Sequence, residues 1–119
     1  MEYMLLIHSD ETQLPQRGTE AFEGFMAAWF AYNQTLIDGG HFISAAGLQP
    51  TTTATTVRKT YGAPSTVVDG PFAETKEQLG GYYVISAADL DEALELAKVL
   101  PIPAGSVEVR PLSFRPEAG

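Results

Sequence analysis

The chain contains two segments with helical periodicity, and a short apolar segment precedes and follows each of them. Between Thr19 and Asp38, apolar side chains recur at intervals of three and four residues, and charged residues occupy the opposite side. This spacing predicts an amphipathic helix. The interval from Leu90 to Leu100 repeats the pattern with four acidic or basic residues on its outer side. Two helices alternating with short strands favour an α+β domain with one antiparallel sheet.

The ends of both helices carry recognisable signals. Thr19 is a suitable N-cap, because its hydroxyl can accept a hydrogen bond from a free N–H of the first turn. Gly39 and Gly40 predict the end of the first helix. Asp89 begins the second helix, and Pro101 ends it, because proline cannot continue a helix.

The remaining segments predict strands and turns. Two β-rich segments, Thr51–Tyr61 and Ser65–Val68, surround a Gly-Ala-Pro turn and predict a hairpin with an exposed threonine-rich edge. The charged segment Ala73–Gln78 is predicted to form one helical turn. Four further strands are expected at Tyr3–Ile7, His41–Leu48, Tyr82–Ser86 and Ser106–Leu112. The order predicts a ferredoxin-like split βαβ fold with an inserted β-hairpin.

The length of 119 residues fits a single domain. We predict that residues 1–114 form this domain and that residues 115–119 form a frayed C-terminal tail. In Tyr3–Ile7 and Tyr82–Ile85, residues of both parities are apolar or aromatic, whereas two helices cover only one face of a sheet. The simplest cover for the second face is the same face of another copy, so we expect a homodimer.

Composition excludes several classes of function. The net charge is −8, and Arg58 and Lys59 are the only adjacent basic residues, so no nucleic-acid partner is expected. The absence of cysteine excludes disulfides, thiolate metal ligands and cysteine nucleophiles. No apolar stretch approaches the ~20 residues that span a bilayer. The first residues lack the pattern of a signal peptide, and a cytoplasmic protein without membrane contact is expected.

Asp69 and His8 are the candidate catalytic residues. Asp69 lies at a predicted strand end in an Asp-Gly-Pro turn, where burial would make its carboxylate a general base. The alternative is that Asp69 only accepts hydrogen bonds within its own turn. His8 ends the first strand with the parity of Met4 and Leu6, and imidazole is the commonest general base in proteins. The alternative is a strand-end histidine bonded to the next loop.

Candidate ligand-binding residues are Arg110, Tyr83 and Arg58. Arg110 shares parity with Glu108, and its guanidinium would suit a carboxylate ligand, with an ion pair to a neighbouring strand as the alternative. Tyr82 and Tyr83 point to opposite faces, so one lines any cleft and the other the helix-side core. The two histidines, at 8 and 41, lack the spacing of a metal site, and no metal or cofactor is predicted.

The segment Val67–Val84, with the sequence VVDGPFAETKEQLGGYYV, closely resembles the DGPF-domain branch of the YCII-related proteins. The opening YMLLIHSDE, the segment AAGLQP and the ending GSVEVRPL resemble the same family. The resemblance implies a dimeric α/β barrel built from ferredoxin-like subunits. Members are largely uncharacterised, and some occur beside extracytoplasmic-function sigma factors. A YciI-like branch has a proposed His–Asp pair, but the first helix here has no histidine, and Asp38 is only a loose positional match for the acid.

Two hypotheses of function follow. The first is a binder of small anionic or aromatic molecules, or a cofactor-independent enzyme, with a cleft beside the sheet. Asp69 and His8 would supply polar groups there, and Arg110 would anchor an anionic ligand. The second is a dimeric interaction module without chemistry of its own, associated with a sigma factor.

Overall fold

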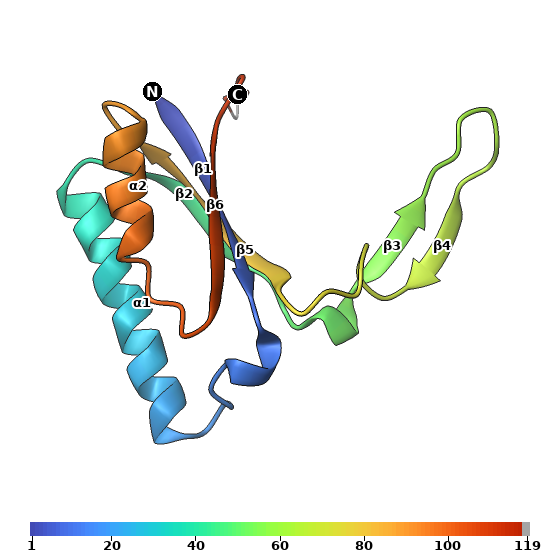
Figure 1. The fold of residues 1–119 in the computed structure, drawn as a ribbon, viewed down its shortest axis with the longest axis horizontal. Coiled ribbons are helices and arrows are strands. Elements are labelled where there is room, and N and C mark those ends of the chain that lie inside the picture. Colours follow the sequence, from blue (N-terminus) through green and yellow to red (C-terminus); the bar gives the residue numbers. More distant parts are fainter. Residues whose placement is uncertain (118–119) are drawn as a thin grey trace.

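The fold is built on a four-stranded antiparallel sheet in the order β2-β5-β1-β6 (Figure 1). The computed structural model describes residues 1–117. The sheet strands are β1 (Glu2–Ser9), β2 (Phe42–Gly47), β5 (Gln78–Ser86) and β6 (Gly105–Pro111). The two α-helices are α1 (Glu20–Asp38) and α2 (Leu90–Lys98). This is the predicted ferredoxin-like α+β fold, and within residues 1–117 the sheet stays open and closes no barrel.

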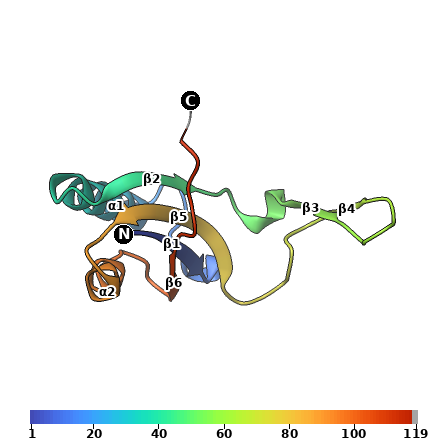
Figure 2. The same cartoon turned by 90° about the horizontal axis from the view of Figure 1, so that it is seen from above.

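Both helices lie on the same side of the sheet, and their ends confirm the sequence signals (Figure 2). The hydroxyl of Thr19 accepts a hydrogen bond from the Phe22 N–H at the start of α1. Asp89 caps α2 in the same way by accepting from the Glu92 N–H. Gly40, which follows α1, has φ +74°, a conformation that glycine adopts without a Cβ clash.

The hydrophobic core fills the space between the helices and one sheet face. Leu5 and Ile85 contribute from the sheet and Leu36 from α1, and all three side chains are fully buried. Burial of such a side chain stabilises the fold by about 1.5–3 kcal/mol. Trp29 of α1 stacks on Tyr83 of β5 with ring centroids 6.0 Å apart. The side chains that hold the helices to the sheet are therefore concentrated around the central strands.

The opposite face of the sheet has no helix over it (Figure 2). Along β1, Tyr3, Leu5 and Ile7 are buried, whereas Met4, Leu6 and His8 are only partly buried. Strand pairing places Val84, Tyr82, Glu108 and Arg110 on the same side as Met4 and Leu6. We call this surface the open face. Two helices thus cover one of the two apolar sheet faces, as the sequence predicted.

The inserted hairpin forms a separate arm of residues 55–69. Strands β3 (Thr55–Arg58) and β4 (Thr66–Asp69) pair only with each other and project beyond the end of the main sheet (Figures 1 and 2). The predicted strand from Thr51 is too long, because Thr51–Thr53 form a short 3-10 helix, η2. Its geometry is held by hydrogen bonds from the Thr53 hydroxyl to Pro50 and from Thr51 to the Glu11 carboxylate.

The prediction of a helical turn at Ala73–Gln78 is wrong. Residues 73–77 form bends and no helical turn. The Gln78 side chain donates to the carbonyls of Ala73 and Thr75, and such bonds compete with helical ones. In the predicted tail, Arg115 forms two hydrogen bonds of 3.0 Å with the Glu2 carboxylate, so this part of it is attached to β1. Residues 118–119 of that tail lie outside the described residues.

Candidate functional site

At His8, strand β1 pairs regularly with one neighbouring strand and irregularly with the other. Its pairing with β6 is regular and places Ser106 opposite. Its pairing with β5 shifts between Ile7 and His8, so that Leu79 lies opposite His8 and Gly80 is the extra residue of a β-bulge. Bulges redirect side chains and are frequent beside functional sites. The sheet is therefore irregular at the residue best suited to proton transfer.

The His8 imidazole is part of a polar row on the open face. Its Nε2 lies 3.6 Å from Oε1 of Glu108, and Oε2 of Glu108 lies 3.9 Å from Nε of Arg110. The Glu108 carboxylate thus stands between an imidazole and a guanidinium. The Arg110 side chain is 70% exposed, so its terminal nitrogens are accessible to a second carboxylate, which a guanidinium binds through two parallel hydrogen bonds.

A second polar pair and an apolar surface adjoin this row. The Ser106 hydroxyl donates a 2.7 Å hydrogen bond to the Glu77 carboxylate, which brings the segment before β5 to the edge of β6. Leu6 lies between Tyr82 and Glu108 in the strand pairing. The open face therefore offers a ligand both charged groups and an apolar or aromatic surface.

The chain after His8 is held firmly. Ser9 and Asp10 are buried, and the Asp10 carboxylate accepts hydrogen bonds from the hydroxyl and the N–H of Thr12. The bond from the Thr12 hydroxyl is the main cause of a lowered Asp10 pKa. Asp10 also caps the 3-10 helix η1 (Glu11–Gln13). The anchored turn keeps the end of β1, and with it His8, in a defined position.

Asp69 and Arg58 lie on the arm, apart from His8 and Arg110 (Figure 1). Asp69 is the last residue of β4, it is exposed, and within residues 1–117 its carboxylate has no hydrogen-bond or ion-pair partner. The turn after it is held by the backbone, through a 2.9 Å bond from the Gly70 N–H to Ala54. Within one chain the structure brings His8 and Arg110 to one face, but neither Asp69 nor Arg58 joins them.

Tyr83 lies on the helix-covered face and Tyr82 on the open face. The Tyr83 hydroxyl donates to the side-chain oxygen of Asn33 in α1. Burial raises the pKa of Tyr83 to about 12. The sheet itself separates Tyr83 from His8, so Tyr82 is the tyrosine available beside the polar row.

The second histidine has a structural position. Nδ1 of His41 lies 2.8 Å from the Ser86 carbonyl oxygen and 3.8 Å from a Glu92 carboxylate oxygen. It therefore joins the start of β2 to the end of β5 and the first turn of α2. Among residues 1–117, no group of three or more His, Asp or Glu side chains is placed to hold a metal ion.

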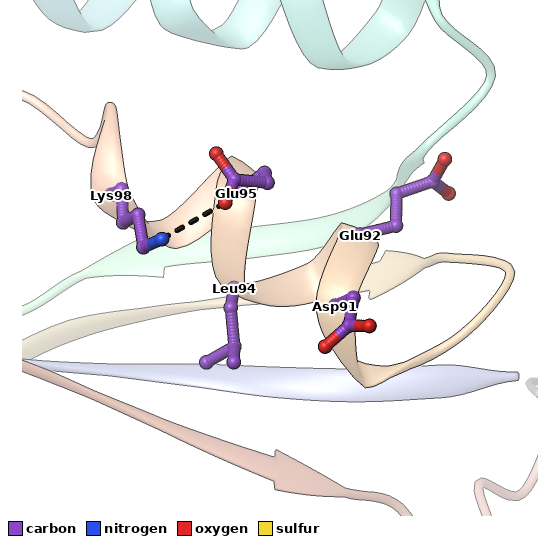
Figure 3. A pocket seen from close by; sticks show the side chains of 5 residues that line it. All are labelled: Asp91, Glu92, Leu94, Glu95 and Lys98. Carbon is purple, nitrogen blue, oxygen red and sulfur yellow. Dashed lines mark hydrogen bonds and ion pairs between the residues drawn. The ribbon is translucent and has the colours of Figure 1, made fainter.

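A hollow on the outer side of α2 is lined by Asp91, Glu92, Leu94, Glu95 and Lys98 (Figure 3). Lys98 and Glu95 form a 2.9 Å ion pair along the helix surface, while Glu92 and Asp91 point away from it. The polar groups diverge, so this hollow lacks the convergence that a ligand site requires.

No helix in the described part of the chain is long and apolar enough to cross a membrane.

Sequence reasoning identified His8, Arg110 and the shared parity of Glu108. It left open which of Tyr82 and Tyr83 lines a cleft and named Tyr83 as the candidate, and it missed Ser106 and Glu77 as neighbours. The alternation from Ser106 to Arg110 carries the signal for Ser106, because residues 106, 108 and 110 share one face of a strand. No local pattern identifies Glu77, because it reaches Ser106 from a loop 29 residues away.

Comparison with known proteins identifies a relative and a family. An uncharacterised protein, R00369 of Rhizobium meliloti (strain 1021), is 42% identical over 117 residues, which cover 96% of this chain and 94% of that protein. The family model of the YCII-related domain matches residues 1–114. The chain therefore belongs to the YCII-related family.

Proposed function

We propose that the protein is a homodimer that binds a small anionic molecule on the open face, at His8, Glu108 and Arg110. The observation that carries the proposal is the placement of an imidazole, a carboxylate and an exposed guanidinium in one row beside Leu6 and Tyr82. Arg110 anchors a carboxylate of the ligand, and the apolar surface receives its aliphatic or aromatic part.

The same groups support a proton transfer that uses side chains alone. His8 accepts the proton, and Glu108, 3.6 Å away, stabilises the imidazolium that forms. This arrangement is suited to removing a proton next to a carbonyl or carboxylate group that Arg110 holds. Tyr82 provides the adjacent surface for an aromatic substrate.

The dimer follows from the uncovered apolar side chains on the open face. Met4, Leu6 and Tyr82 are partly buried although no helix lies over them. Apolar sheet faces of this kind are covered in stable proteins, and a second copy of the chain related by a twofold axis can provide the cover. Light scattering should therefore report twice the chain mass of 12.8 kDa, and a 12.8 kDa species at micromolar concentration would contradict the dimer.

A thermal-shift screen of aromatic and aliphatic carboxylates tests the binding site, because a ligand that binds only the native state raises its midpoint. Arg110→Gln should weaken binding of any hit about 10- to 100-fold, the range expected for charge-assisted hydrogen bonds. Arg17→Gln is the matched control, because it removes the same charge on the loop before α1. Equal affinity of wild type and Arg110→Gln would place the ligand elsewhere.

The screen also separates this proposal from the hypothesis of an interaction module. A module without chemistry of its own has no preformed ligand site, so a broad library would give no stabilisation. A sigma factor that remains bound through purification, together with an empty screen, would favour the interaction module.

A further inference from the structure

The arm of residues 55–69 is unsupported within its own chain. Strands β3 and β4 pair only with each other, and Val57 lies directly opposite Val67 with 57% and 68% of the two residues exposed. Figure 2 shows the arm running out beyond the sheet. A two-stranded hairpin alone is at best marginally stable in water. The arm therefore needs a surface that its own chain does not provide.

The two faces of the arm differ. Opposite residues in an antiparallel pair share a face, so Thr55, Val57, Val67 and Asp69 lie on one face. Thr56, Arg58, Thr66 and Val68 lie on the other. We call the first set the valine face. The unpartnered Asp69 carboxylate belongs to it, so a surface that covers Val57 and Val67 also meets Asp69.

Charge favours a second copy of the chain as that surface. The arm carries Arg58 and Lys59 against Asp69, a net charge of +1. The rest of the chain has five cations against fourteen carboxylates, a net charge of −9. An arm with the opposite sign of charge to the rest of the chain is attracted to the remainder of another copy.

The open face supplies complementary groups. Leu6 and Tyr82 offer an apolar surface, and Arg110 offers a guanidinium that only Glu108 approaches within residues 1–117, at 3.9 Å. The arm cannot use the open face of its own chain in the observed position, because it extends away from it (Figure 1). The same face of a second copy is free to receive it.

We propose that each arm lies across the open face of the second copy, with its valine face inward, and that Asp69 completes the partner's site at His8 and Arg110. This inference rests on the proposed function, because it assigns a further residue to that site. It accounts for the Asp69 carboxylate and the polar row, which the fold keeps apart within one chain. The ligand site would then be assembled from two chains.

Photocrosslinking tests the position of the arm, and the absence of cysteine makes labelling unambiguous. Thr55→Cys carries a benzophenone on the valine face, and Thr66→Cys carries it on the opposite face as a matched control. Each labelled protein is mixed with isotope-labelled wild type, and the crosslinked peptides are identified by mass spectrometry. The proposal expects Thr55→Cys to link to residues 2–9, 78–86 or 105–111 of the other chain, in several-fold higher yield than Thr66→Cys.

Links confined to the same chain, or links to α1 or α2 of the other chain, would overturn the position of the arm. A charge exchange adds a second measurement. Asp69→Arg and Arg110→Asp should each raise the dimer dissociation constant about tenfold, and the double variant should restore it. Circular dichroism checks that each variant is folded.

The outcomes separate the two proposals. A wild-type dimer that binds carboxylates, and whose dimer dissociation constant is unchanged by Asp69→Arg and by Arg110→Asp, overturns the arm and leaves the site on the open face intact. A wild-type chain that stays monomeric at all concentrations overturns both.

Discussion

The α-carbon of Gly105 lies against the carbonyl oxygen of His8, so close that a side chain at position 105 would overlap this oxygen. A Cβ there would also come within 3.0 Å of the His8 carbonyl carbon and the Ser9 α-carbon. Gly105 has φ +147°, which side chains rarely permit. The glycine therefore allows β6 to begin beside His8, and the position of the polar row depends on it.

Gly105→Ala should lower the free energy of unfolding by about 1–3 kcal/mol, because the backbone of two strands must move to admit the methyl group. Urea denaturation followed by the fluorescence of Trp29 measures the change. Gly24→Ala is the control, since a Cβ at this position in α1 meets no atom within 4 Å. It should stabilise the protein by up to about 1 kcal/mol. Equal effects of both substitutions would contradict the close approach.

The pair of Glu2 and Arg115 predicts a dependence of stability on acid pH. Its hydrogen bond from Arg115 is the main reason that the Glu2 pKa lies below its ordinary value of 4.5. A lowered folded-state pKa stabilises the protein above the unfolded-state value, and this contribution is lost as the pH falls through the folded-state value. Arg115→Gln should therefore make acid unfolding less steep between these two values.

Denaturation curves at a series of acidic pH values measure this effect of Arg115→Gln. Arg17→Gln controls for the change of net charge, because Arg17 lies over the Phe22 ring and forms no ion pair within the described residues. A loss of stability independent of pH would show that Arg115 acts through packing.

The burial of Tyr83 predicts that the stability of the protein depends on pH in the alkaline range. Burial raises the pKa of this side chain from 10.0 to about 12, so the folded state keeps the proton longer than the unfolded state. The associated stability is fully present below the unfolded-state value and is lost as the pH rises toward the folded-state value. Tyr83→Phe should make this alkaline loss smaller, while the lost hydrogen bond to Asn33 costs about 1 kcal/mol at neutral pH.

Alkaline denaturation with detection of phenolate absorbance tests Tyr83→Phe. Tyr61→Phe is the matched control, because Tyr61 is fully exposed at the tip of the arm. This substitution should leave the loss of stability at alkaline pH unchanged. Identical curves for the two variants would show that ionisation of Tyr83 does not limit alkaline stability.

Glu11 predicts how firmly the base of the arm is held. Its two carboxylate oxygens accept hydrogen bonds of 3.0 and 2.9 Å from the N–H and the hydroxyl of Thr51. Glu11→Ala should increase hydrogen exchange of the Thr51 amide about 10- to 100-fold, the range for lost hydrogen bonds to a charged group. Glu11→Gln keeps an acceptor and should show a smaller change. Unaltered exchange in both variants would show that other contacts hold this segment.

Local signals predicted the regular elements because each of them is encoded within a few residues. Thr19 and Gly40 mark the ends of α1 where the structure has them, and the parity of Glu108 and Arg110 is that of the observed strand. Parity cannot decide which of two adjacent tyrosines faces the helices, since that depends on how the sheet meets α1. Tyr83 faces them because it packs on Trp29.

The arm was predicted as a hairpin, but its separation from the sheet was not. The segment around Thr51 bends because Glu11, 40 residues earlier in the chain, binds it. The bends before β5 arise from side-chain bonds such as that of Thr75 to Glu77. The contact of Glu11 with Thr51 has no local pattern, so the relation of Asp69 to His8 could be obtained only from the three-dimensional structure.

The strand order leaves β2 and β6 at the two edges of the sheet, and the edges differ in their tendency to recruit other chains. β6 carries Glu108 and Arg110 and ends at Pro111, features that block edge-to-edge pairing. β2 has the uncharged sequence FISAAG and offers no such barrier. We therefore expect aggregation under destabilising conditions to begin at β2, and a lysine placed there to improve recovery of the protein after heating.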